Sequence, residues 1–249
     1  MLLSPTVEKL HDLRLRGMAK ALEEQLQMDG VERLTFEDRL GLLVDREMAE
    51  RDSRRLERRL RNAKLRINAT VEDVDLRASR GLDRSFWLSL TSLSFVRRHL
   101  NVLITGPTGV GKTYLACALA QKACREGYTA VYHRLPRLLE DLAIAHGDGA
   151  YSKLLRQLSR VDLLVLDDWG LAPLTQAGRR DLLELVEERY DTRSTIVTSQ
   201  FPISSWHDLI GDPTLADAIL DRLVHNAYPI ELAGDSMRKR THPLKEAGA

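Results

Sequence analysis

A glycine-rich segment carries the clearest chemical signal in this sequence: Gly106-Pro107-Thr108-Gly109-Val110-Gly111-Lys112-Thr113. It matches the phosphate-binding pattern G-x-x-x-x-G-K-[ST] at every fixed position. Glycines let the backbone turn its N–H groups toward phosphate oxygens, and a following helix N-terminus adds partial positive charge. Lys112 can reach the β- and γ-phosphates, and the Thr113 hydroxyl can ligate Mg²⁺. The segment predicts binding of ATP with Mg²⁺.

The flanking sequence gives this segment the setting that a phosphate loop needs. Residues 101–105 are apolar and β-branched, which predicts a buried strand, and the residues from Lys112 onward predict a helix. The alternative is a glycine-rich turn that matches by chance, and a strand before it and a helix after it argue against that interpretation.

Two acids at the end of an apolar run form a second candidate site. Residues 162–166 predict a buried strand, and Asp167 and Asp168 follow it. A carboxylate at the C-terminal edge of a strand beside the phosphate loop can hold Mg²⁺, a role we assign to Asp167, and Asp168 can orient and polarise the attacking water. The alternative is a solvated strand end, because Asp often starts turns. The pair predicts Mg²⁺-dependent ATP hydrolysis.

Two later residues are further candidates for catalysis. Gln200 follows a predicted strand at 194–198 and can reach the γ-phosphate or the water, with Ser199 as the alternative and an ordinary strand-to-loop transition still open. Arg222 can reach into a neighbouring subunit and neutralise charge on the γ-phosphate. By itself, Arg222 is typical of a surface ion pair with Asp221 or Asp217.

The elements that position these residues fall into two parts. Before about residue 70 the sequence predicts helices alone: one amphipathic helix from Val7 to Leu26 and a second helical stretch that begins at Thr35. From residue 101 onward, strands and helices alternate, which predicts a parallel sheet. We expect a helical domain at 1–70, a connector at 71–100 and a nucleotide-binding core at 101–249.

The predicted core contains two further strands besides the three named above. We place strands at 128–132 and 228–232 in addition to those at 101–105, 162–166 and 194–198. Helices are predicted at 178–190 and 203–226, and a helical insert at 136–160 is interrupted by Gly147-Asp148-Gly149.

The second N-terminal helical stretch is rich in basic residues. The candidate contacts to a duplex backbone are Arg54, Arg55, Arg58, Arg59, Arg61, Lys64 and Arg66. Basic side chains that neutralise phosphates release counterions, which gives salt-sensitive and sequence-tolerant affinity for DNA. The alternative is a solvated helix with internal pairs such as Glu47–Arg51. The excess of arginine favours non-specific binding of duplex DNA.

Composition limits the remaining possibilities. The chain has 249 residues and a formal net charge of +1, so any nucleic-acid surface must be local. The N-terminus does not resemble a secretion signal, and no apolar run approaches membrane-spanning length. Cys117 and Cys124 fall on one predicted helix, roughly 10 Å apart along its axis, too far for a disulfide. We expect a cytoplasmic protein with reduced cysteines.

These features together resemble the AAA+ ATPases. Within that group, the chain is similar to the IstB-type ATP-binding proteins of insertion sequences, whose relatives are the DnaC-type helicase loaders and the DnaA-type initiators. The match covers nearly the whole chain and is carried most specifically by residues 13–22, by Leu166-Asp167-Asp168-Trp169-Gly170 and by Asp235-Ser236-Met237-Arg238.

The resemblance implies a fold and a function. It implies a three-layer α/β sandwich with a five-stranded parallel core sheet and an N-terminal all-α domain. It also implies ATP-dependent assembly into a homo-oligomer on DNA, with nucleotide at the subunit interfaces, and cooperation with a transposase encoded alongside. In relatives the insert at 136–160 lies near DNA, which adds candidate contacts at Arg134, Arg137, Lys153 and Arg156, although a solvated helix face is an equal alternative.

The sequence departs from the AAA+ pattern at two places. Most AAA+ proteins have Glu where this chain has Asp168, and the shorter side chain predicts slow hydrolysis. Most also carry a C-terminal helical lid with an arginine that contacts ATP, whereas residues 235–249 are too few for a lid. Arg238 is a candidate substitute for that arginine.

Two other functions compete with a transposition helper. A replicative helicase loader similar to DnaC would have the same core, with a preference for single-stranded DNA. A small-molecule kinase would use the same phosphate loop, but the acid pair on the third strand argues against that class.

Overall fold

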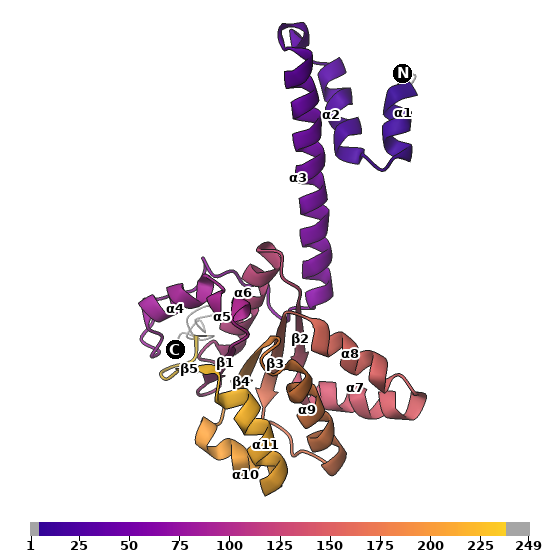
Figure 1. The fold of residues 1–249 in the computed structure, drawn as a ribbon. Coiled ribbons are helices and arrows are strands. Elements are labelled where there is room, and N and C mark those ends of the chain that lie inside the picture. The colour runs from indigo at the N-terminus through magenta and orange to yellow at the C-terminus, as the bar shows by residue number, and fades with distance from the viewer. Residues whose placement is uncertain (1–4, 238–249) are drawn as a thin grey trace, which may run out of the picture. The chain divides into compact units, whose positions relative to one another are not determined.

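The computed structural model describes residues 5–237, and the chain forms two compact units, Met1–Arg58 and Arg59–Ala249. The division falls between Arg58 and Arg59, whereas the sequence places the change of organisation near residue 70. The elements that begin the chain are α1 (Pro5–Asp12), α2 (Arg16–Leu26), the 3-10 turn η1 (Val31–Arg33) and α3 (Phe36–Ala63) (Figure 1). The helical N-terminal region predicted from the sequence is therefore present.

The single helix predicted from Val7 to Leu26 is wrong. The chain forms two helices, because Arg14 adopts a left-handed backbone conformation with φ of 61° between α1 and α2. A non-glycine residue in this conformation interrupts a right-handed helix, and hydrophobic spacing alone does not reveal it.

Helices α2 and α3 approach each other closely at Gly17. A Cβ atom on Gly17 would lie 2.6 Å from the Cα of Glu47, so only glycine fits there. The buried Glu47 carboxylate accepts hydrogen bonds from the Gly17 N–H at 2.7 Å, the Met18 N–H at 3.2 Å and Arg51 Nε at 2.7 Å. Burial acts to raise the pKa of Glu47, but the bonds from Arg51, Met18 and Gly17 outweigh it and hold the pKa below its usual value.

The predicted connector at 71–100 is partly helical. It contains α4 (Arg84–Thr91), which begins where the Asp83 carboxylate accepts the Phe86 N–H at 2.7 Å, and α5 (Ser94–Arg97). Trp87 and Phe95 are buried, and the Phe86 ring meets Tyr228 edge-on with 5.8 Å between ring centroids. The connector is thus packed against the core of its own unit.

Five parallel strands form one sheet in the order β2-β3-β4-β1-β5. Their bounds are β1 (Asn101–Thr105), β2 (Ala130–Arg134), β3 (Leu163–Trp169), β4 (Ser194–Ser199) and β5 (Ala227–Glu231). This confirms the parallel sheet expected from the sequence. The predicted strand at 128–132 lies two residues later, because Gly127 and the residues after it still close helix α6 through the Tyr128 N–H to Ala123 C=O bond.

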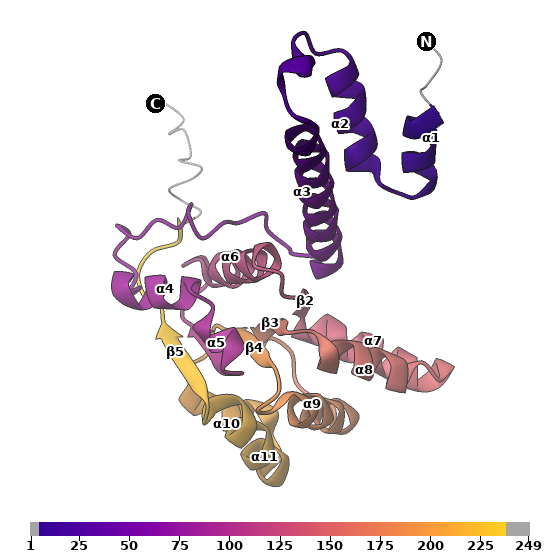
Figure 2. The same ribbon diagram turned by 45° about the horizontal axis from the view of Figure 1, so that its top comes forward.

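Helices cover both faces of the sheet and make three layers. The helices are α6 (Lys112–Arg125), α7 (Leu135–Asp148), α8 (Tyr151–Arg160), α9 (Gln176–Arg189), α10 (Trp206–Ile210) and α11 (Pro213–Val224), with the 3-10 turn η2 (Ile203–Ser205). Figure 2 shows α6 on one face with α4 and α5, and α9, α10 and α11 on the other. The helical stretch predicted at 203–226 is divided at Gly211, which has φ of 71°.

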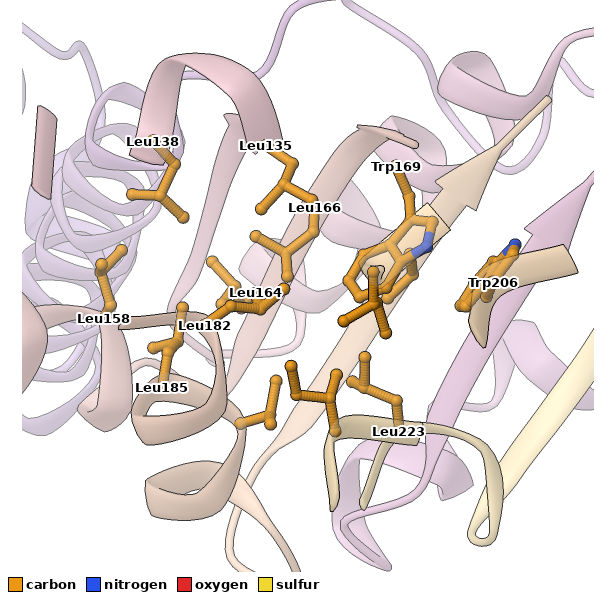
Figure 3. Packing of buried hydrophobic residues seen from close by; sticks show 14 of the residues in the cluster. Leu135, Leu138, Leu158, Leu164, Leu166, Trp169, Leu182, Leu185, Trp206 and Leu223 are labelled. Carbon is orange, nitrogen blue, oxygen red and sulfur yellow. The ribbon is translucent and has the colours of Figure 1, made fainter. Parts of the chain in front are cut away.

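The core beneath α7 to α11 is almost entirely aliphatic. Side chains from β3, α7, α8, α9 and α11 interdigitate there, including Leu164, Leu138, Leu158, Leu182 and Leu223 (Figure 3). At the end of β3, the Trp169 ring packs on Trp206 with 4.9 Å between centroids. This packing fixes the end of β3, where the acid pair lies.

Within residues 5–237, no helix has the length and apolar character needed to cross a membrane.

Candidate nucleotide-binding site

The phosphate loop joins β1 to α6, as predicted. Gly106 has φ of 140°, and a Cβ atom there would lie 2.2 Å from the Leu232 carbonyl oxygen. The residues after β5 therefore support the loop directly: the Leu232 N–H donates to Thr105 C=O at 2.8 Å, and the Met237 N–H donates to Gly109 C=O at 2.9 Å. The segment after β5 thus contacts both the end of β1 and the loop itself.

Lys112 is buried at the start of α6. Its Nζ donates to the carbonyls of Gly106 at 2.7 Å and Pro107 at 2.8 Å, which places the ammonium inside the loop. Burial lowers the pKa of Lys112, while the charges of Asp167 and Asp168 act in the opposite direction. A confined ammonium on neutral carbonyls is suited to bind an anion.

Asp167 is fully buried at the centre of a hydrogen-bond network. Thr113 Oγ1 donates to its carboxylate at 3.0 Å, Tyr132 OH donates at 2.5 Å, and Thr198 Oγ1 donates as well. Burial, followed by the bond to Asp167, raises the pKa of Tyr132, which keeps the phenol in its donating form. Thr113 and Asp167 thus place a hydroxyl and a carboxylate oxygen together, the ligand types that Mg²⁺ prefers.

Asp168 lies beside two arginines. It has φ of 64°, at the point where the pairing of β3 with β4 shifts register between Leu166 and Trp169. Arg134 Nε contacts its Oδ2 at 2.6 Å, and Arg66 Nη1 lies 3.8 Å from Asp168 Oδ2 and 3.6 Å from Asp167 Oδ2. The sequence assigned Arg66 and Arg134 to DNA, but the structure pairs both with the acids of the nucleotide site.

Gln200 and Ser199 have different partners after β4. Gln200 Oε1 accepts a hydrogen bond from Thr108 Oγ1 at 2.8 Å, so its side chain reaches the phosphate loop. The buried Ser199 hydroxyl instead donates to the Trp169 carbonyl at 2.9 Å. Of the two alternatives, Gln200 is therefore the one whose amide is placed against the loop.

These residues surround a single cavity of about 580 Å³. Such a volume falls in the range of roughly 300–1,000 Å³ that is typical of small-molecule sites. The lining side chains combine cations, acids and hydroxyls, which suits a nucleotide polyphosphate with a divalent ion. The lining includes Arg66, Asp73, Arg80, Thr108, Lys112, Thr113, Tyr114, Arg134, Asp168, Thr198, Ser199, Gln200 and Met237.

Arg222 lies away from this cavity. Its Nε contacts Glu187 at 2.7 Å and its Nη1 lies 3.7 Å from Asp221, so the ion pair expected as the alternative is present. Its carbonyl accepts a hydrogen bond from Asn101, the first residue of β1, whereas the phosphate loop follows the last residue. Arg222 therefore lies near the N-terminal ends of the strands, whereas the phosphate loop of the same chain lies at their C-terminal ends.

The other basic residues predicted to contact DNA fall into two groups, those with a partner in the protein and those without one. Arg54 pairs with Glu50, Arg55 with Asp52, and Arg137 with Glu140 and Asp141, while Arg59 donates to the Cys124 carbonyl. Among these candidates, Arg58, Arg61, Lys64, Lys153 and Arg156 are exposed and form no ion pair with another described residue. Arg238 lies outside the residues that the structure describes.

Three residues of this site escaped the sequence analysis: Tyr132, Thr198 and Arg80. Tyr132 and Thr198 lie on β2 and β4, the two neighbours of β3 in the sheet. Strand order would have placed them beside Asp167, but strand order was not predicted. Arg80 lies in the connector and gives no local signal.

Comparison with known proteins assigns the chain to a family. Residues 8–245 match the family model described as IstB-like ATP binding protein. A protein of Sinorhizobium fredii, y4pL, named as an insertion sequence ATP-binding protein, is 53% identical over 239 residues, which cover 96% of this chain and 98% of that protein.

Solved structures share the fold of the core. The structure of DnaI is 24% identical, with a TM-score of 0.58 over 66% of this chain and 91% of that one. The DnaC helicase loader is 20% identical, with a TM-score of 0.55 over 68% of this chain and 99% of that one. The α/β fold is therefore that of the AAA+ domains of these proteins.

Proposed function

Because the chain belongs to the family of IstB-like ATP-binding proteins of insertion sequences, we propose that it is an ATP-dependent DNA-binding transposition helper. It assembles on duplex DNA and directs a partner transposase, encoded alongside, to target sites. The observation that carries this proposal is the convergence of Lys112, Thr113 and Asp168 on one cavity, with Thr113 hydrogen-bonded to the buried Asp167. Its cofactors are ATP and Mg²⁺, and its location is the cytoplasm.

The arrangement of the site supports slow, assembly-dependent hydrolysis. Thr113 and Asp167 would hold Mg²⁺, which when bound neutralises charge on the phosphates. Asp168 would accept the proton of the attacking water, but Arg134 and Arg66 already lie against its Oδ2 and compete with the water for that oxygen. Gln200 would orient the water from the loop side.

Non-specific DNA binding is supported by exposed cations without acid partners. Lys153 and Arg156 are three residues apart on α8, whose buried Leu155 and Leu158 face the core. Side chains at this spacing share one face of a helix. Arg58, Arg61 and Lys64 supply exposed cations along α3 and just after it.

The double variant Lys153→Ala/Arg156→Ala tests the DNA contact. Loss of two phosphate contacts should flatten the slope of log affinity against log salt by about 2 and weaken duplex binding at least about tenfold. Arg97→Ala/Arg98→Ala, an exposed basic pair on and beside α5, is the matched control and should bind as the wild type does. If the slope of log affinity against log salt were the same for all three proteins, α8 would not contact DNA.

A homo-oligomer with nucleotide at subunit interfaces gives Arg222 its role. Arg222 lies away from the cavity of its own chain, so in this proposal its guanidinium contacts the nucleotide of a neighbouring subunit. Arg222→Ala should therefore lose the rise in ATPase rate with protein concentration while keeping its affinity for nucleotide. A variant that hydrolyses ATP like the wild type at high protein concentration would overturn this role.

The second candidate is a replicative helicase loader, which the fold of the DnaC helicase loader favours. Filter binding with ATP on duplex and on single-stranded DNA separates the two functions. A transposition helper should retain duplex DNA, and a protein that binds only single strands contradicts our proposal. A transposase gene next to this one would support the helper, and a helicase gene would support the loader.

A further inference from the structure

Arg80 is a buried arginine with little compensation for its charge. It is 4% exposed, Nη1 donates to the Val110 carbonyl at 3.2 Å, and Nη2 donates to the Asp75 carbonyl at 3.1 Å. Both acceptors are neutral and both bonds are long, and Nε is buried without a partner. Within residues 5–237, Arg80 forms no ion pair with a carboxylate.

Arg189, a second buried arginine, is an example of an arginine with a structural role. Arg189 is 2% exposed, and all three of its nitrogens donate: Nε to Thr195 Oγ1 at 3.0 Å, Nη1 to the Leu158 carbonyl at 2.7 Å, and Nη2 to the Ser194 carbonyl. Arg189 thus has the full set of bonds that burial of a guanidinium requires. Arg80 lacks that set.

The position of Arg80 indicates which kind of ligand balances its buried charge. Its guanidinium lines the nucleotide cavity, and a Cβ atom on Gly111 would lie 2.6 Å from Nη1. Glycine at 111 therefore lets the guanidinium lie directly against the phosphate loop. Burial lowers the pKa of Arg80, while Asp75 and Tyr114 act in the opposite direction, so an added anion is favourable here.

The two acids of the nucleotide site form their hydrogen bonds and ion pairs with residues other than Arg80. Asp167 and Asp168 contact Thr113, Tyr132, Thr198, Arg66 and Arg134. Arg80 contacts none of these and instead touches the loop at Val110, next to the start of α6. Mg²⁺ and the γ-phosphate would be held beside the acids, so Arg80 is placed for the phosphates nearer the nucleoside.

We propose that Arg80 is a nucleotide-binding residue whose guanidinium pairs with the phosphates that ADP and ATP have in common. The inference rests on nucleotide binding at this site, as the proposed function does. Arg80 thereby adds to the loop a cation that the phosphate-binding pattern does not contain.

Titration of a fluorescent ADP and a fluorescent ATP analogue into Arg80→Gln tests this assignment. Glutamine removes the charge and keeps a neutral N–H donor. We expect both affinities to fall at least about tenfold, because a charge-assisted bond to phosphate is lost. Arg77→Ala, an exposed arginine of the same segment, should bind both nucleotides like the wild type.

Two readouts separate a ligand role from a structural one. Arg80→Lys keeps the charge and should retain more affinity than Arg80→Gln, and the nucleotide-free Arg80→Gln protein should melt within a few degrees of the wild type. Wild-type affinity for ADP in Arg80→Gln, or a large fall in melting temperature with unchanged affinity, overturns the assignment. If the wild-type protein bound no nucleotide, the assignment of the nucleotide-binding site would be wrong, and that of Arg80 with it. If the protein bound nucleotide and duplex DNA but had no role in transposition, the proposed function would be wrong and the assignment of Arg80 would still hold.

Discussion

Asp167 in the nucleotide site is reached by side chains from three separate segments, Thr113, Tyr132 and Thr198, whereas charged residues of α3 pair mainly within their own helix. Arg54 pairs with Glu50, four residues away, and Arg55 pairs with Asp52, three residues away. The first arrangement depends on the tertiary fold. The second depends only on helix formation.

This difference predicts how the two regions respond to substitution. Buried groups that share one network lose their effect together when one member is removed, so single changes should be large and non-additive. Exposed helical pairs contribute about 0.3–0.5 kcal/mol each, and changes there should be small and additive.

Lys112→Ala should abolish nucleotide binding. The change removes the ammonium that lies inside the loop, 2.7 Å from the Gly106 carbonyl, and we expect at least about a hundredfold loss of affinity, as for charged contacts to phosphate. Isothermal titration with ATP and Mg²⁺ measures it. Lys122→Ala, on the same helix but paired with Glu126 at the surface, is the control and should bind normally. Tight ATP binding by Lys112→Ala would contradict the site.

Asp168→Asn should separate hydrolysis from binding. An amide cannot accept a proton from water, so the steady-state ATPase rate should fall about a hundredfold or more while ATP affinity stays within a few fold. Asp208→Asn, an acid 95% exposed on α10, provides the comparison. If Asp168→Asn hydrolysed ATP at the wild-type rate, another residue would have to be the base.

Gly17→Ala should destabilise the N-terminal unit and spare the nucleotide site. A Cβ atom would lie 2.6 Å from Glu47 Cα, and such overpacking costs about 1–3 kcal/mol. Gly41→Ala is the matched control, because nothing lies within 4 Å of a Cβ there and a helical glycine-to-alanine change should stabilise by about 0.5–1 kcal/mol. Chemical denaturation with parallel nucleotide titration measures both. A parallel loss of ATP affinity in Gly17→Ala would mean that the two regions are not independent.

Acid should weaken the N-terminal unit through Glu47. The pKa of Glu47 in the folded protein is lowered from its ordinary value of 4.5, so the contribution of Glu47 to stability is present above that value and is lost as pH falls through the folded pKa. Glu47→Gln lacks this titration. The stability difference between wild type and Glu47→Gln, followed by denaturation at several pH values from 7 downward, should therefore shrink below about pH 4.5. A difference independent of pH would show that the carboxylate is not the group responsible.

The same contrast explains what the sequence could predict. The phosphate loop, the strands and the acid pair are local patterns, and each was found at its place because one segment encodes it. Tyr132, Arg66 and Arg134 meet the acids through strand order and tertiary packing, which no local pattern encodes. The break at Arg14 was missed for a different reason: hydrophobic spacing continues through it although the backbone does not.

The central position of β1 has a consequence for synthesis of the protein. β1 pairs with β4 and β5, the last two strands to leave the ribosome, and Thr113 and Thr108 meet partners 54 and 92 residues later. A nascent chain that already contains the phosphate loop therefore lacks the strands that shape it. Competence to bind nucleotide should arise only near the end of translation, so that unfinished chains do not engage ATP.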